Sequence, residues 1–318
     1  MLKDIEARLL ALEQEQHTLE SAAPGPDGEL RLKQIRRDCK ELLESCRELT
    51  AEDKVYLARH PKRPNIQAYL TALFTDFFEQ KGDRLGKEDA SILCGIALYK
   101  GEPVTIIGHR KGSNLEENLR CNFGMPGPEG YRKALRAMKQ AEKFGRPVIT
   151  FIDTPGAYPG LEAEANGQSE AIARNLYEMS LLTVPVIAVV TGEGSSGGAL
   201  ALGVANSVLM LENAIYSILS PEGFASILWK DSSRSAEACE LMKLTAQDLY
   251  RFGMIDGIVP EPLGGAQREP SAAFLALDGM LSEQLARLQK LGPAALSAQR
   301  YKKFRAMGAA GAIPKEEV

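Results

Sequence analysis

Short apolar runs rich in Val and Ile alternate with helical stretches through the middle of this 318-residue chain, and this alternation constrains the fold most. The first two runs are joined by a short segment containing Lys100 and Gly101, which is typical of an antiparallel hairpin. The later runs are separated by helical stretches, so they should pair in parallel. The sequence therefore predicts an α/β body. The apolar runs are Ile92 to Leu98, Val104 to Gly108, Val148 to Ile152, Val186 to Thr191, Val208 to Leu211 and Ile215 to Ile218, and the helical stretches are Gly130 to Phe144, Gln168 to Leu182 and Gly198 to Val204.

The first fifty residues predict two helices joined by a turn at Ser21 to Gly28. Each helix carries an apolar stripe with alternating spacings of four and three, so an antiparallel hairpin over residues 1–53 is expected. A partner chain could complete this seam as easily as the hairpin itself. The stripes are Ile5, Leu9, Leu12, Gln16 and Leu19 in the first helix, and Leu32, Ile35, Cys39, Leu42, Cys46 and Leu49 in the second.

Two further helical regions flank the α/β body. After a Pro-bounded link at Arg59 to Pro64, a short helix is expected through Tyr69 to Phe78. Beyond Pro260 the sequence becomes rich in Ala and Leu, which predicts a peripheral helical tail over residues 267–318.

Composition narrows the possible partners and compartments. The chain has 38 basic and 42 acidic residues, so there is no overall positive field to attract nucleic acid or anionic lipid. The apolar runs are too short to cross a bilayer, and the charged N-terminus lacks a signal peptide's apolar region, so a cytoplasmic protein is expected. The five cysteines contain no C-x-x-C pair, so neither disulfides nor a metal site is predicted.

The glycine-rich segment from Thr191 to Ala199 matches two common motifs that the rest of the chain does not support. It fits a dinucleotide-binding fingerprint, but it lies at mid-chain after several earlier strands. It also fits the elbow of a serine hydrolase around Ser196, but every histidine precedes this serine, whereas that class places its histidine last. Asp153 to Gly156 imitates a GTPase turn in a chain without a phosphate-binding loop. We therefore disfavour all three interpretations.

The two glycine-containing loops each follow the carboxyl end of a parallel strand, where open α/β sheets place ligands. Gly197 and Gly198, at a helix start, offer consecutive backbone N–H groups with no side chain in the way, as in an oxyanion hole. In the loop from Asp153 to Gly160, prolines and glycines predict a rigid wall. Asp153 and Glu193 are interpreted as turn and capping carboxylates.

Six ordered segments carry a resemblance to a known family. They are Asn122 to Ala134, Phe151 to Gly160, Gly167 to Leu176, Gly192 to Ala201, Ser220 to Lys230 and Glu261 to Ala266. Together they resemble the carboxyltransferase α subunits of bacterial-type acetyl-CoA carboxylase. The resemblance implies a crotonase-like ββα superhelix over residues 54–266, with an N-terminal helical hairpin and a C-terminal helical extension. It also implies transfer of a carboxyl group from carboxybiotin to acetyl-CoA, forming malonyl-CoA for fatty-acid synthesis.

The resemblance also implies site residues and partners. Gly197 and Gly198 correspond to the family's oxyanion hole, which would face carboxybiotin. The substrate-lining residues correspond to Thr154, Pro155, Gly156 and Tyr158, with Gly194 shaping the approach. Expected partners are a zinc-bearing β subunit in an α2β2 assembly, the biotin carboxyl carrier protein and biotin carboxylase. The alternatives are a stand-alone crotonase-type acyl-CoA hydrolase or hydratase, and a non-catalytic assembly subunit.

Overall fold

The computed structural model describes residues 2–22 and 25–308, and its centre is an eight-stranded sheet. Strands β1 to β3 are antiparallel, and every pairing from β3 onward is parallel. The β2–β3 hairpin and the parallel pairing of the later strands agree with the sequence prediction. The order is β1-β2-β3-β4-β5-β6-β8, with β7 beside β5. The strands are β1 Thr75–Glu79, β2 Ile92–Tyr99, β3 Glu102–His109, β4 Val148–Thr154, β5 Val186–Ser195, β6 Ser207–Leu211, β7 Ile215–Ser217 and β8 Gly257–Val259.

The β2–β3 hairpin follows from its turn residues. Tyr99 pairs with Glu102, and the two residues between them, Lys100 and Gly101, have φ values of 50° and 87°. Two consecutive positive φ angles match the right-handed twist of the flanking strands. By contrast, every residue of β4 and β5 is buried, because helices cover both faces of the parallel part of the sheet.

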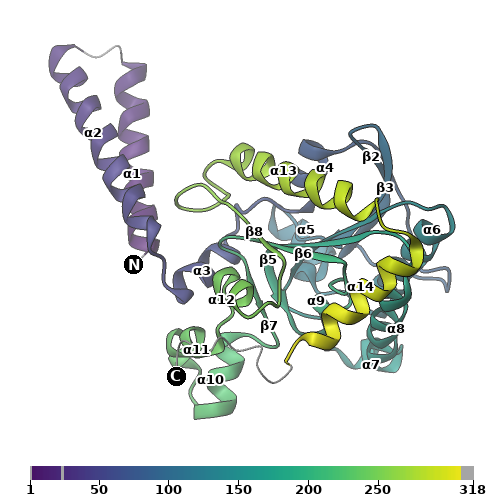
Figure 1. Ribbon diagram of the computed structural model, residues 1–318. Helices are drawn as coiled ribbons and strands as arrows, with labels where there is room; N and C mark the ends of the chain where they lie inside the picture. The colour runs from purple at the N-terminus through teal and green to yellow at the C-terminus, as the bar shows by residue number, and fades with distance from the viewer. Residues whose placement is uncertain (1, 23–24, 309–318) are drawn as a thin grey trace.

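Helices form a layer on each side of the sheet (Figure 1). On one side lie α4 Ile66–Leu73 and α13 Pro270–Leu288, and on the other lie α6 Pro128–Lys143, α8 Gln168–Leu181, α9 Ser196–Leu200 and α14 Pro293–Ala306. The shorter helices are α5 Leu115–Arg120, α7 Leu161–Ala165, α10 Pro221–Trp229, α11 Ser235–Met242 and α12 Ala246–Arg251. Among the described residues, no helix is both long and apolar enough to cross a membrane.

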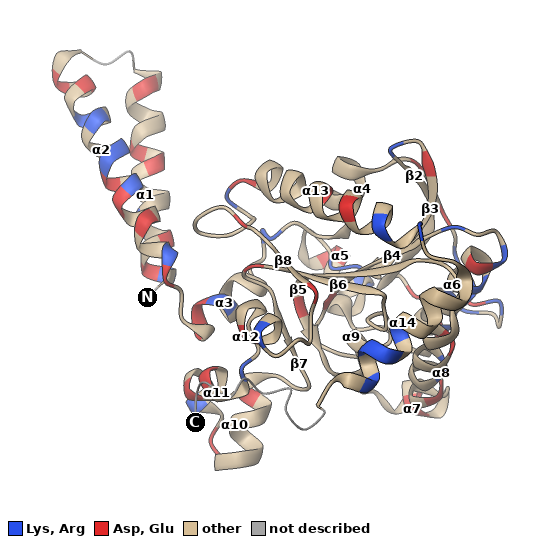
Figure 2. Cartoon of the chain, in the orientation of Figure 1, with Lys and Arg blue, Asp and Glu red and all other residues tan. Residues whose placement is uncertain are grey.

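The N-terminal helices α1 Leu2–Ser21 and α2 Pro26–Glu44 form the expected antiparallel hairpin, which projects from the body (Figure 1). The apolar stripes face each other, with Ile5, Leu9, Leu32 and Ile35 buried. Acidic and basic residues alternate with other residues along both helices (Figure 2), and Arg31 of α2 pairs with Glu15 of α1. The α3 helix, Ala51–Ala58, connects the hairpin to the sheet.

Several expected elements differ from the structure. The helix predicted through Tyr69 to Phe78 ends at Leu73, because Thr75–Glu79 instead pairs with β2 as the outermost strand. The helix predicted from Gly198 to Val204 is shorter and begins two residues earlier, as α9. The three-residue strand β8 carries too few residues to show a pattern and was not expected.

The sequence analysis predicted that the C-terminal helices are peripheral, but the structure shows them packed into the core. Leu277, Leu281 and Leu285 of α13 are buried in the same core as the sheet, and so is Leu296 of α14. The last part of the predicted tail, residues 309–318, lies outside the described residues.

A buried arginine fastens α14 to the end of α8. The Arg300 side chain is fully buried and its guanidinium donates to the carbonyl oxygens of Met179 at 2.8 Å and Leu182 at 2.8 Å. It also donates to the Val184 carbonyl at 3.2 Å and to Asn206 Oδ1 at 2.5 Å. The last carbonyl oxygens of a helix have no N–H donors within it, so Arg300 acts as a C-terminal cap supplied by a distant helix.

We predict that Arg300→Met destabilises the protein by about 3 kcal/mol, because it leaves several buried carbonyl oxygens without donors. Urea unfolding of the full chain measures this change. Arg287→Met on the exposed face of α13 is the control and should change stability by less than about 0.5 kcal/mol. Equal unfolding curves for the two variants would contradict the capping role.

Candidate functional site

The two glycine-containing loops meet at the carboxyl ends of β4 and β5. Thr154, the last residue of β4, is the register partner of Gly194, near the end of β5. Parallel neighbours place the loops that follow them at one edge of the sheet. The structure therefore brings together the two loops that the sequence predicted to share a cleft.

The contact between the loops explains the need for glycine at position 198. A Cβ atom at Gly198 would lie 2.7 Å from the carbonyl carbon of Gly156 and would also collide with the Ala157 nitrogen. Both are backbone atoms, which cannot move aside by a change of side-chain rotamer. Gly156 has φ 141°, a conformation that side chains disfavour. The two loops are therefore packed backbone against backbone.

Gly197 occupies a more open environment in the first turn of α9. It is half-buried, and a Cβ there would lie 3.5 Å from Ile172 Cγ2 of α8, an ordinary contact. Ser196, just before it, is exposed and has φ 58°, so the chain turns sharply from β5 into α9. The N–H groups of a helix's first turn have no acceptor within the helix, so those of Gly197 and Gly198 can bind an oxygen from outside.

The loop after β4 forms a wall whose residues have different surroundings. Thr154 is fully buried, and its hydroxyl accepts the Gly156 N–H at 3.0 Å, so it shapes the turn from within. Pro155 and Tyr158 are exposed, and Tyr158 N–H donates to the Pro126 carbonyl at 2.9 Å. Gln168, the first residue of α8, donates to the carbonyls of Pro126 at 2.8 Å and Tyr158 at 2.9 Å. These bonds hold the wall against a second loop.

Asp153 and Lys111 lie at the base of the loops. Lys111 Nζ is 2.6 Å from Asp153 Oδ1, and the same oxygen accepts the Glu193 N–H at 3.0 Å. Asp153 therefore caps the strand end, as the sequence analysis expected. Burial lowers the pKa of nearby His109 to about 4, although the negative charge of Asp153 opposes the shift. His109 is therefore neutral at pH 7 and contributes no charge to the site.

A second ion pair, which sequence reasoning missed, supports β5 just before the glycine loop. Arg63 Nε donates to the Thr191 carbonyl at 2.6 Å, and Arg63 Nη2 lies 2.5 Å from Glu261 Oε1. Burial alone would raise the pKa of Glu261, but Arg63 and the Asn213 and Ala266 amides hold it below its ordinary value. Both residues lay within segments that the sequence analysis singled out, but nothing in the sequence paired them across 198 positions.

The arrangement combines backbone N–H donors, a rigid loop and buried charges that are already paired. The described residues contain no group of three or more His, Cys, Asp or Glu side chains that could hold a metal ion. Main-chain amides at a helix start stabilise negative charge on an oxygen without exchanging protons.

The family model described as acetyl co-enzyme A carboxylase carboxyltransferase-like matches residues 2–308. The chain is also similar to two proteins that are each named acetyl-coenzyme A carboxylase carboxyl transferase subunit alpha. The protein from Geobacillus thermodenitrificans is 59% identical over 260 residues, which is 82% of this chain and 80% of that protein. The protein from Listeria monocytogenes is 56% identical over 82% of both chains.

Solved structures show the same fold at low sequence identity. The chain matches a malonate decarboxylase hetero-dimer from Pseudomonas with a TM-score of 0.56 and 20% identity, covering 69% of this chain and 89% of that one. It matches transcarboxylase 12S with a TM-score of 0.55 and 19% identity, covering 74% of this chain and 46% of that one. The crotonase-like fold expected from the sequence is thereby confirmed.

We predict that Gly198→Ala lowers the free energy of unfolding by about 3 kcal/mol, because the added methyl group meets backbone atoms. Gly197→Ala has room for its methyl group, so its effect should stay within about 1 kcal/mol. Thermal unfolding of the two purified variants compares them directly. Equal stability of both would show that the loops do not pack as described.

Proposed function

Because the chain belongs to the family of acetyl-CoA carboxylase carboxyltransferase α subunits, we propose that the Gly197 and Gly198 amides stabilise negative charge on an oxygen during carboxyl transfer. The protein is a subunit of a biotin-dependent transferase that moves a carboxyl group onto acetyl-CoA. The product is malonyl-CoA, which commits acetyl units to fatty-acid synthesis. The names of its relatives favour this activity over that of a stand-alone hydrolase or hydratase.

The proposal rests on the close backbone contact between Gly198 and the loop after β4. Gly198 allows the loop after β4 to pack against the start of α9. Gly197 is half-buried and has no side chain that would cover the first turn of α9. Two adjacent amides at the start of a helix are oriented before the substrate arrives, so they need no reorganisation during the reaction.

The donor set fits carboxybiotin carried on a separate protein, because Gly197 and Gly198 place no side chain over their amides. When bound, carboxybiotin supplies the carboxyl group that is transferred. The two amides would hold its ureido oxygen. Lys111 and Asp153 are already paired with each other, so a side-chain base is not assigned to this chain.

We assign the substrate-lining role to the loop after β4. The exposed Pro155 and Tyr158 form its outer surface, whereas the buried Thr154 and Gly156 set its shape. Gly194 lies beside Thr154 in the sheet and keeps the approach narrow, since a Cβ there would lie 3.0 Å from the Tyr216 ring.

The proposed partners are a zinc-bearing carboxyltransferase β subunit, forming an α2β2 assembly, together with the biotin carboxyl carrier protein and biotin carboxylase. The relatives' name, subunit alpha, supports the need for a second subunit. The hairpin of α1 and α2 provides an arm that projects away from the sheet and is available for packing against another chain (Figure 1).

We predict that the isolated chain is inactive and that it gains activity when mixed with its β subunit. The measurement is decarboxylation of malonyl-CoA in the presence of biocytin, with each subunit alone as a control. Full activity of the isolated chain would contradict the need for a partner. An inactive mixture that has formed a stable complex would contradict the proposed reaction.

The role of the Gly197 amide can be tested with a matched pair of variants in the assembled enzyme. Gly197→Pro removes the N–H in the first turn of α9, where proline is tolerated, and should lower kcat about 10²-fold to 10³-fold. Gly197→Ala keeps the N–H and should retain kcat within about threefold of the unaltered enzyme. Equal kcat values for these two variants would exclude the amide as a donor.

A further inference from the structure

The Glu193 carboxylate is buried on the strand that leads into the proposed oxyanion site. Glu193 lies in β5, one residue before Gly194, and its side chain is only 6% exposed. The Glu193 backbone N–H donates to Asp153 Oδ1, so the Asp153 carboxylate lies close to the Glu193 residue. Burying a charged carboxylate costs free energy unless a cation compensates it.

The compensating cation is Arg59, the residue that follows α3. Arg59 Nη2 donates to Glu193 Oε1 at 2.7 Å, and within the described parts of the chain no other side chain is hydrogen-bonded to this carboxylate. The position of Arg59 is fixed by packing, since a Cβ at Gly192 would lie 3.1 Å from the Ala58 carbonyl oxygen. The end of α3 therefore lies against the segment that leads into the site.

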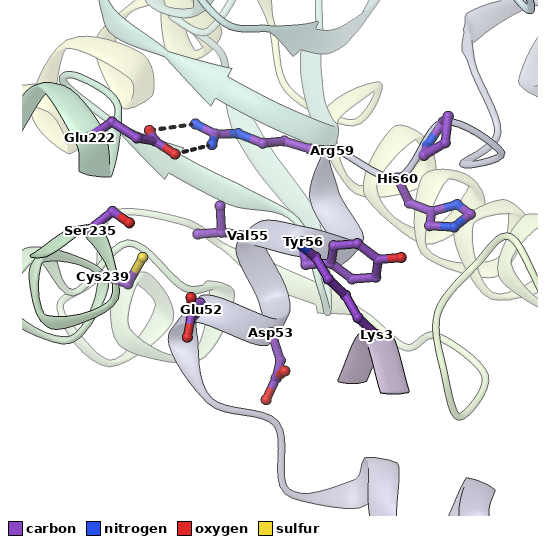
Figure 3. Close-up of a pocket in the computed structure, with 11 residues that line it drawn as sticks. Lys3, Glu52, Asp53, Val55, Tyr56, Arg59, His60, Glu222, Ser235 and Cys239 are labelled. Atoms are coloured by element: carbon purple, nitrogen blue, oxygen red, sulfur yellow. Dashed lines mark hydrogen bonds and ion pairs between the residues drawn. The ribbon is translucent and has the colours of Figure 1, made fainter. Parts of the chain in front are cut away.

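Arg59 also reaches a third element. Its Nη1 donates at 2.8 Å to Glu222 Oε1, near the start of α10. Figure 3 shows this pair beside a cavity of about 380 Å³, also lined by residues of α3 and α11. The Glu222 side chain is 48% exposed, so this contact is screened by water and weaker than the contact with buried Glu193.

We infer that Arg59 is a positioning residue for the carboxyltransferase site. It neutralises Glu193, and so holds the end of β5 in the place that aligns the Gly197 and Gly198 amides. A similar pair lies next to it, because Lys111 neutralises Asp153 and Asp153 accepts the Glu193 N–H. The inference rests on the proposed function, because it assigns Arg59 to the same site.

The test uses variants of Arg59 and Glu193 in the complex with the β subunit. Arg59→Gln leaves Glu193 buried without a cation, so kcat for malonyl-CoA decarboxylation should fall about 10-fold to 100-fold while KM changes less than about threefold. The double variant Arg59→Gln with Glu193→Gln removes the unpaired charge and should recover at least about tenfold of the lost kcat. A general loss of folding would also be repaired in the double variant, so the positioning role requires that Arg59→Gln keeps KM and complex formation while kcat falls.

The matched control is Arg174→Gln, which breaks an exposed pair with Glu170 on α8 and should leave kcat unchanged. The inference is overturned if Arg59→Gln retains kcat within twofold, or if the double variant is no better than Arg59→Gln. It is also overturned if Arg59→Gln prevents assembly and Glu193→Gln does not restore it.

A second readout separates this inference from the proposed function. Amide hydrogen exchange of residues 192–198 in the full chain should be about tenfold faster in Arg59→Gln and should return toward the original rate in the double variant. Unchanged exchange would overturn the positioning role even in an active enzyme. An inactive unaltered complex with the expected exchange pattern would instead count against the proposed function alone.

Discussion

The site depends on a backbone-to-backbone contact between two loops. Gly198 in the first turn of α9 touches the peptide between Gly156 and Ala157, and no side chain separates them. This contact is possible because β4 and β5 are neighbouring parallel strands whose ends lie together. The geometry of the proposed donors is therefore a property of the sheet, and a side chain at position 198 would push the two strand ends apart.

Three ion pairs lie around the same region. Asp153 is balanced by Lys111, Glu193 by Arg59 and Glu261 by Arg63. Each pair is partly or fully buried, where an unpaired ion would be costly. Because these charges satisfy one another, the donor role proposed for the site falls to main-chain amides. This division of roles agrees with a reaction in which charge develops on an oxygen of the substrate.

Much of the fold could be predicted from the sequence, and the reasons are local. The β2–β3 hairpin follows from Lys100 and Gly101, and the parallel strands follow from apolar runs separated by helices. The strand β1 could not be predicted, because Thr75 to Glu79 are mostly exposed and take their conformation from pairing with β2. The glycine loops could be recognised in the sequence because tight turns and close backbone contacts require glycine.

The charged residues around the site could not be assigned in the same way. Arg59 and Arg63 lie in a segment that the sequence identifies only as an extended link, and Glu193 and Glu261 are far from them in the chain. An arginine has the same local pattern whether it faces water or a buried carboxylate. Sequence motifs therefore located the glycine loops that carry the proposed main-chain donors, whereas the ion pairs around them required the spatial arrangement.

The α8 helix connects the loop after β4 to the C-terminal helix α14. It begins with Gln168 on the wall loop, it places Ile172 beneath Gly197, and its last carbonyls are bound by Arg300. Arg300 follows Leu182 by 118 positions. During synthesis the chain emerges from the ribosome in order, so both glycine loops are made long before the arginine that completes the helix beneath them. The site can therefore reach its final form only after translation has passed Arg300.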